Sequence, residues 1–241
     1  VQVYALPTLR RLAVIESEAG PIYPDQFHPD GERLATTAED DSTGQLWSAQ
    51  DGALLRTFGG HEGTVGQAVL ADEGRVLVTS TDSVAYTWDV ATGALRARLA
   101  PGGGGPYGSS LEIAADPKGR TVAVVSQEGQ ACKLLLWDWT HEATTPVLGR
   151  NVPVGVGCFR TAVFAPRGPY AAFGIFDFNA SPPYDLVIWN RATGEPQATV
   201  SRGAPSWEMA FSPDGNALLV SVASRGSRLL KRLDAATGAV Q

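Results

Sequence analysis

The chain has 241 residues, 44% of them hydrophobic, and a formal net charge of −6, which fits a globular protein with a sizeable core. The acidic balance disfavours sequence-independent nucleic-acid binding, which needs a basic surface for phosphate contacts. Apolar runs fall short of the roughly 18 residues of a membrane span, and the N-terminus lacks a secretory pattern, so a soluble cytoplasmic protein without membrane contacts is expected.

Two strands are expected at the N-terminus, at 1–6 and 12–15, before the first complete unit of a repeat. The chain therefore begins at Val1 in the middle of a repeat. We interpret the chain as a processed product or an excised part of a longer protein. Cys132 and Cys158 lie far apart with no Cys-x-x-Cys motif, so buried or spectator thiols are favoured over a disulfide or a zinc site.

A turn of the Pro-Asp-Gly type recurs five times. Its glycines lie 43, 45, 49 and 47 residues apart, a period typical of the blades of a β-propeller. They are Gly31, Gly74, Gly119, Gly168 and Gly215. The predicted fold class is therefore all-β, a propeller of four-stranded antiparallel blades with five visible repeats.

Each unit is predicted to contain four strands, with the turn between the first and the second. Small and β-branched residues mark the second strands. These second strands cover 33–37, 75–80, 120–126, 169–175 and 217–222. An aromatic residue or its equivalent closes the third strand, at Tyr4, Trp47, Trp88, Trp137, Trp189 and Leu233. Because such regular aromatics are usually core, we interpret the four tryptophans as apolar wedges between adjacent blades.

A single domain spanning 1–241 follows from this repeat. Its predicted parts are a third and fourth strand at 1–16 and repeats at 17–58, 59–100, 101–150, 151–200 and 201–241. Two closures remain open: residues 11–15 supply the outermost strand of a five-bladed ring, or the chain is part of a six- or seven-bladed ring. An open ring would leave two apolar blade faces bare, and such faces would drive self-association.

The chain resembles the Trp-Asp (WD) repeat family of β-propellers in degenerate, bacterial-type form. Trp88-Asp89 and Trp137-Asp138 carry the family dipeptide, and the other repeats carry degraded versions of it. Gly60-His61 and Asp82 also precede Trp88 at the family's spacing. The resemblance implies a structural hydrogen-bond network in this repeat, formed by His61, Ser80, Asp82 and Trp88.

The resemblance also implies that partners dock on the rim at the start of the innermost strands. The matching positions are Tyr23, Gly66, Leu111, Arg160 and Trp207. Because Tyr, Trp and Arg are enriched at the energetic centres of interfaces, we expect Tyr23, Leu111, Arg160 and Trp207 to form a partner-binding rim for a protein or peptide. Bacterial propellers of this kind often belong to larger signalling proteins, as sensors or scaffolds.

Motifs for catalysis, metal binding or a cofactor are absent from the sequence, and the glycine run at 102–105 reads as a flexible connection. The predicted function is therefore a non-enzymatic scaffold or sensor that uses no metal and no cofactor. The alternative is a five-bladed glycan-binding or glycoside-hydrolysing propeller with carboxyls around the axis, at Asp25, Glu112 and Glu208.

Overall fold

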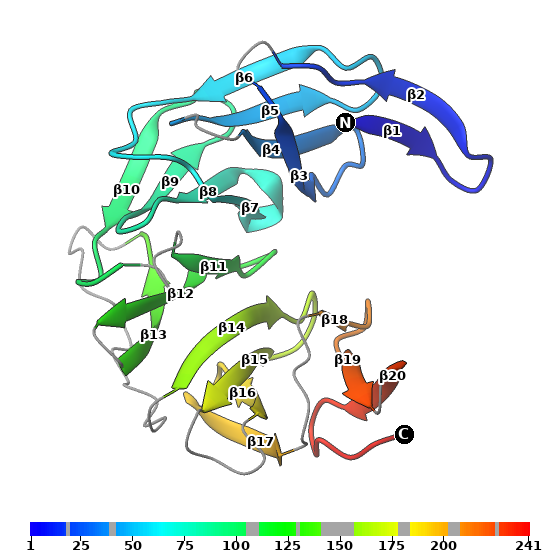
Figure 1. Cartoon of the computed structure of the whole chain (residues 1–241), viewed down its shortest axis with the longest axis vertical. Coiled ribbons are helices and arrows are strands. Elements are labelled where there is room, and N and C mark those ends of the chain that lie inside the picture. The colour runs from blue at the N-terminus through cyan, green and yellow to red at the C-terminus, as the bar shows by residue number, and fades with distance from the viewer. Residues whose placement is uncertain are drawn as a thin grey trace.

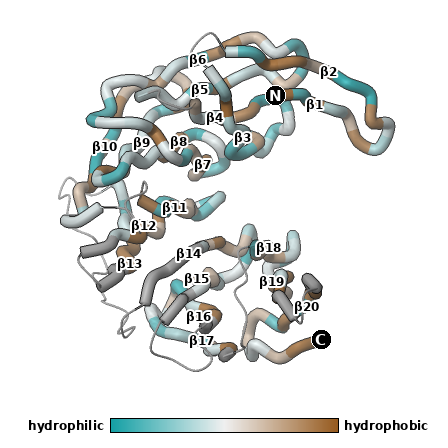
Figure 2. Tube along the Cα trace, in the orientation of Figure 1, coloured by the Kyte–Doolittle hydropathy of each residue, from teal (hydrophilic) through white to brown (hydrophobic). Residues whose placement is uncertain are grey.

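The computed structural model is all-β, and its sheets follow one another along an arc (Figure 1). The residues that the structure describes are 1–17, 20–38, 42–104, 111–128, 131–140, 157–177, 184–201, 208–224 and 227–241. Neighbouring strands are antiparallel in every sheet. Hydrophobic stretches recur in the sheets all along the arc (Figure 2).

Six sheets are described, and we call them the first sheet and blades 1 to 5. The first sheet contains β1 (Gln2–Ala5) and β2 (Arg10–Val14); blade 1 contains β3 (Ile22–Phe27), β4 (Arg33–Ala38), β5 (Gly44–Ser48) and β6 (Leu54–Phe58). Blade 2 contains β7 (Gln67–Ala71), a turn of 3₁₀-helix η1 (Asp72–Gly74), β8 (Val76–Ser80), β9 (Ala85–Asp89) and β10 (Leu95–Leu99). Blade 3 contains β11 (Glu112–Ala115), β12 (Thr121–Glu128) and β13 (Ala131–Asp138). Blade 4 contains β14 (Gly157–Phe164), β15 (Tyr170–Asp177), β16 (Tyr184–Asn190) and β17 (Glu195–Ser201), and blade 5 contains β18 (Met209–Phe211), β19 (Ala217–Ser224) and β20 (Ser227–Asp234).

The tryptophans fill the spaces between blades, which confirms their predicted role as wedges. Trp47 packs on Val3, Ala13 and Ile15 of the first sheet, and Trp88 packs on residues of blade 1. Trp137 and Trp189 lie in the same way against blades 2 and 3. Each wedge therefore faces the preceding sheet, so the core is a series of similar layers between blades.

The first sheet has the register of a third and fourth strand. Trp47 pairs with Leu54 directly after a bulge, and Tyr4 pairs with Arg11 in the same way. Tyr4 thus occupies the wedge position of its sheet.

The proposed five-bladed closure differs from what the structure shows. Strand β2 pairs with β1, in a sheet separate from blade 5. The outer side of β20 is taken by the C-terminal residues themselves, through the bridge between Leu233 and Val240 and a hydrogen bond from Gln241 N–H to Arg232. The first sheet and blade 5 lie at the two ends of the arc (Figure 1).

The recurring turns pack against one another from blade to blade. The buried His28 ring reaches from the first turn to the carbonyl oxygen of Gly74 in the second, where Nε2–H donates over 3.1 Å. The N–H of Glu73 in turn donates to Pro117 in the third turn, at 2.7 Å. Gly74 adopts φ +85°, and a Cβ there would lie 2.0 Å from His28 Nε2. The backbone conformation and this close approach together require glycine.

Candidate functional site

A hydrogen-bonded chain links the loop before β7 to the core of blade 2. The indole N–H of Trp88 donates to Thr79 Oγ1 at 2.8 Å, and that hydroxyl lies 2.7 Å from His61 Nε2. His61 Nδ1 lies 2.7 Å from the carbonyl oxygen of Ser42 and donates to it. These roles agree with a neutral imidazole, protonated on Nδ1, that accepts from the threonine.

One of the four residues predicted for this network, Ser80, lies elsewhere. Ser80 faces the opposite side of β8, where its hydroxyl donates to the carbonyl oxygen of Leu111 in blade 3 at 2.8 Å. Successive residues of a strand point to opposite faces, so the one-residue difference between Thr79 and Ser80 changes which blade is contacted. The Asp82 carboxylate accepts from Ser83, at 3.2 Å, in the turn between β8 and β9.

The loop that carries His61 is further held by aromatic contacts. The His61 ring lies edge-on to Tyr86, with 4.7 Å between centroids, and 4.8 Å from Trp88. The Tyr86 hydroxyl accepts from the backbone N–H of Glu62 at 3.0 Å. The backbone of Glu62 at the rim is therefore held by the contacts of His61 and by its own hydrogen bond to Tyr86.

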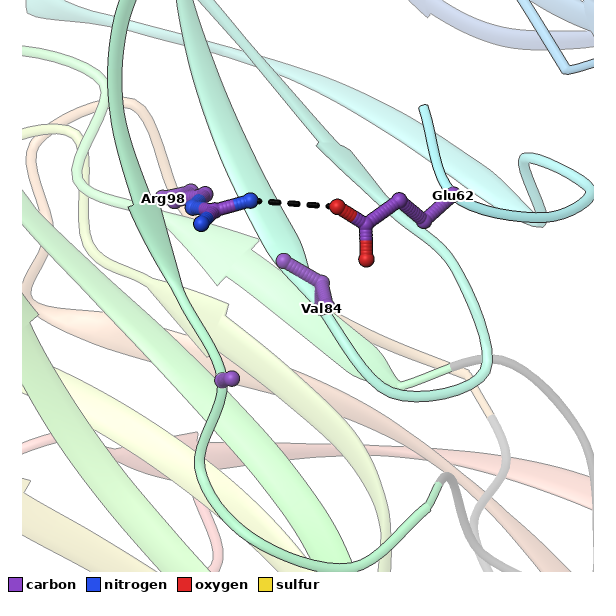
Figure 3. A pocket seen from close by; sticks show the side chains of 4 residues that line it. Glu62, Val84 and Arg98 are labelled. Carbon is purple, nitrogen blue, oxygen red and sulfur yellow. Dashed lines mark hydrogen bonds and ion pairs between the residues drawn. The ribbon is translucent and has the colours of Figure 1, made fainter. Parts of the chain in front are cut away.

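A hollow of about 380 Å³ opens on the rim beside this loop. It is lined by Glu62, Val84, Arg98 and Ala100, which come from the loop before β7, the turn before β9 and the end of β10. Val84 is nearly buried, while Arg98 and Glu62 are exposed and form an ion pair of 3.1 Å (Figure 3). The hollow therefore combines an apolar wall with one charge of each sign. Sequence reasoning missed it, because its residues lie far apart along the chain.

The four predicted rim residues differ in exposure and in how far the structure describes them. Tyr23 is 50% exposed in β3, at the end of blade 1 that corresponds to the hollow in blade 2. Leu111 is fully buried, and its N–H donates to the carbonyl oxygen of Thr81, so it packs against blade 2 and cannot contact a partner. Arg160 lies at a bulge of β14, but its side chain falls outside the described residues, as does all of Trp207.

Polar side chains of the innermost strands bind the next blade. Gln26 accepts from the N–H of Leu70 at 2.7 Å, and Gln67 accepts from the N–H of Ile113 at 2.8 Å. The amide of Gln67 also donates to Glu112 at 2.8 Å. These bonds satisfy backbone groups on the free edges of innermost strands, which would otherwise be open to other strands.

The carboxyls of the glycosidase alternative belong to three different blades. Glu112 is engaged with Gln67 as described, and Glu208 is exposed next to β18. Asp25 lies at a bulge of β3; the residue as a whole is exposed, but its carboxyl is largely desolvated by the surrounding protein. This desolvation raises the pKa of Asp25 to about 6, against the lowering effect of hydrogen bonds from Thr37 and Ala68 N–H. The surrounding structure accounts for the raised pKa without any catalytic role.

Within the described ranges, no three His, Cys, Asp or Glu side chains gather as a metal site would require. Over the same residues, no helix has the length and apolar character needed to cross a membrane.

Comparison with solved structures places the chain among the β-propellers. It superimposes with a TM-score of 0.67 on the Cps50 (Swd1) β-propeller domain of Myceliophteria thermophila, at 17% identity, covering 91% of this chain and 66% of that one. A chain of a mitotic checkpoint complex gives a TM-score of 0.65 at 15% identity, with 86% and 59% covered. At these identities the likeness shows the fold, which confirms the predicted fold class.

Sequence comparisons support a WD-repeat family. Residues 52–89 match the family model for the WD domain, G-beta repeat, and this segment contains His61, Thr79 and Trp88. The chain is also 31% identical, over 113 residues and 46% of its length, to the periodic tryptophan protein 2 homolog of Schizosaccharomyces pombe, of which it spans 12%. It thus spans less than two thirds of each of these proteins. Propellers of the WD40 kind are generally protein-interaction scaffolds and typically non-enzymatic.

Proposed function

We propose that this chain is a non-catalytic propeller that captures a protein or peptide on the rim that carries Tyr23 and the hollow of blade 2. The observation that carries the proposal is the hollow itself, whose wall at Glu62 is held by His61 and Tyr86. A wall held in this way needs little ordering when a partner binds, which lowers the entropic cost of association.

The chemistry of this rim suits a polypeptide partner. An exposed ion pair such as Glu62–Arg98 contributes at most about 1 kcal/mol to stability, so either charge can change partner at small cost. A peptide with an apolar side chain beside charged groups can contact Val84 and both charges. Tyr23 adds an exposed aromatic ring on the neighbouring blade, of the kind enriched at interface centres.

Arg160 and Trp207 remain in the proposal as further rim positions. What supports them is their alignment with Tyr23 at the start of the innermost strands of blades 4 and 5. The proposal further places the chain in the cytoplasm, as a scaffold or sensor portion of a larger bacterial signalling protein. The family resemblance and the composition support that placement.

Affinity capture tests the proposal. The wild-type chain and the variants Tyr23→Ala, Arg98→Ala, Arg160→Ala and Trp207→Ala are used as baits in host-cell extract, and bound proteins are identified by mass spectrometry. Arg75→Ala is the matched control, because Arg75 is an exposed arginine in the turn at the opposite rim of blade 2.

We expect one set of proteins to bind the wild type and Arg75→Ala, and to be depleted with the rim variants, while the melting temperature stays nearly unchanged. Equal capture by every variant, or no specifically bound protein at all, would contradict the proposal. A matching fall in melting temperature would show that the altered residue is structural.

A further inference from the structure

Two carboxylates and one guanidinium lie together at the hollow of blade 2. The Glu62 carboxylate lines the hollow, and Arg98 Nη1 contacts its Oε1 at 3.1 Å. A Cβ at Gly63 would lie 3.6 Å from Asp82 Oδ1, which places the Asp82 carboxylate beside the residue that follows Glu62. Negative charge therefore exceeds positive charge here, as it does over the whole chain, whose net charge is −6. Such a surface attracts a cationic partner.

The apolar wall of the hollow suits the stem of a basic side chain. Val84 lies beside the ion pair of Glu62 and Arg98 (Figure 3), in the same turn as Asp82. At about 380 Å³ the hollow is near the lower end of the range for ligand pockets, so it suits a side chain better than a folded element. Lys and Arg carry an aliphatic stem and a charged end, which can contact an apolar wall and a carboxylate at the same time.

Arg98 can bind the main chain of the same partner. A guanidinium has five N–H donors, and the ion pair with Glu62 uses one nitrogen, Nη1. Arg56 shows this kind of binding inside the chain, since its two terminal nitrogens donate to the carbonyl oxygens of Ala91 and Thr92 at 2.8 and 3.0 Å. An extended peptide offers similar carbonyl oxygens, so Arg98 contributes to binding although its charge has the same sign as that of a basic partner.

We infer that the hollow of blade 2 binds an extended basic segment of a partner protein through one Lys or Arg side chain. The stem packs on Val84, and the charged end lies between Glu62 and Asp82. Arg98 donates to the main chain of the segment. Because the ion pair of Glu62 with Arg98 is exposed, sharing Glu62 with a second cation costs little. This partner chemistry rests on the proposed function, since it describes what binds at the proposed rim.

The first test selects a random peptide phage library on the wild-type chain, on Glu62→Gln and on the control Glu73→Gln. Glu73 is a matched control because its exposed carboxylate lies in η1, at the opposite rim of blade 2. We expect the wild type and the control to enrich the same peptides, each with a Lys or Arg residue. Selection on Glu62→Gln should no longer favour that residue.

Binding constants then separate the charged end of the side chain from its stem. Fluorescence polarisation measures the affinity of one selected peptide, and of the same peptide with norleucine in place of the basic residue. Loss of an exposed charge pair should weaken binding of the basic peptide about threefold to fivefold in Glu62→Gln and in Asp82→Asn. Neither substitution should weaken binding of the norleucine peptide, which lacks the charge that they contact. Melting temperatures check that each variant is folded.

The outcomes distinguish this inference from the proposed function. Selected peptides that lack a basic residue and lose affinity for Arg98→Ala would overturn the inference but leave the rim as the binding site. A basic peptide that binds Glu62→Gln as tightly as the wild type would also overturn it. Peptides that bind every rim variant equally, or a library that yields no peptide, would contradict the inference and count against the proposed function as well.

Discussion

The indole N–H of Trp88 donates to the hydroxyl of Thr79 at 2.8 Å, and in blade 1 Trp47 donates to Thr36 at 2.9 Å in the same register. In blade 4 the corresponding residue of the second strand is Phe173, and within the part of the chain that the structure describes the buried indole N–H of Trp189 has no hydrogen-bond partner. The wedges are thus alike in packing but different in hydrogen bonding.

We expect Trp88→Phe to destabilise the chain by about 1–2 kcal/mol more than Trp189→Phe. Both substitutions remove similar apolar area, but only the first leaves a buried hydroxyl without its donor. Urea unfolding of both variants measures the difference, and Trp47→Phe should behave as Trp88→Phe does. Equal losses for Trp88→Phe and Trp189→Phe would show that the bond to Thr79 contributes nothing net.

Gly74→Ala should destabilise the chain more than Gly31→Ala. Both glycines have positive φ, so each alanine costs about 1 kcal/mol in backbone conformation. A Cβ at Gly74 would also meet His28 at 2.0 Å, whereas nothing lies within 4 Å of a Cβ at Gly31. Thermal unfolding compares the two, and Gly74→Ala in a His28→Ala background should lose the excess.

The pH dependence of stability should change in Asp25→Asn. Because the pKa of Asp25 rises from 3.8 to about 6 on folding, the folded state binds the proton more tightly than the unfolded state. The resulting stabilisation is complete below pH 3.8 and is lost as the pH rises through 6. Relative to the wild type, Asp25→Asn should therefore gain stability between pH 4 and 7, by at most about 1 kcal/mol because the carboxyl is partly solvated.

Urea midpoints of both proteins across this pH range measure the effect. Asp214→Asn is a control of opposite sign. Hydrogen bonds from Ser212 and the backbone N–H of Asn216 lower the pKa of Asp214, so that variant should lose stability at neutral pH and approach the wild type in acid. A flat difference between wild type and Asp25→Asn would exclude a raised pKa at that carboxyl.

The ion pair between Asp116 and Arg191 should contribute far more than the pair between Glu62 and Arg98. Asp116 is buried, and Arg191 links it from blade 4 to blade 3 while also donating to Gly168. Breaking a buried pair costs about 3–5 kcal/mol, since it leaves one charge without its partner. We expect Asp116→Ala to show a loss of this order in urea unfolding, and Arg98→Ala to lose less than about 1 kcal/mol.

Much of the fold was predictable because several independent sequence features recur with the same period and at fixed offsets from one another. The turn glycines and the wedges both recur once per blade, and the second strands expected at 33–37 and 75–80 match β4 and β8 closely. The hydrogen-bonded chain from Trp88 to His61 was harder to predict from the sequence. The threonine that accepts from the indole lies eleven residues before Trp47 but nine before Trp88, because the intervening hairpins differ in length. A fixed sequence spacing therefore does not identify this threonine.

The blade pattern, the wedge positions and the antiparallel strands could be predicted from the residues alone, since these features follow from periodicity and turn chemistry that act locally. Three features became visible only in the folded chain: Thr79 binds His61, Leu111 is buried, and Glu62 and Arg98 line one hollow. Those outcomes depend on which face of a strand meets the next blade and on contacts between distant loops. A shift of one residue along a strand moves a side chain to the opposite face of the sheet, and the local sequence pattern does not show which face meets the next blade.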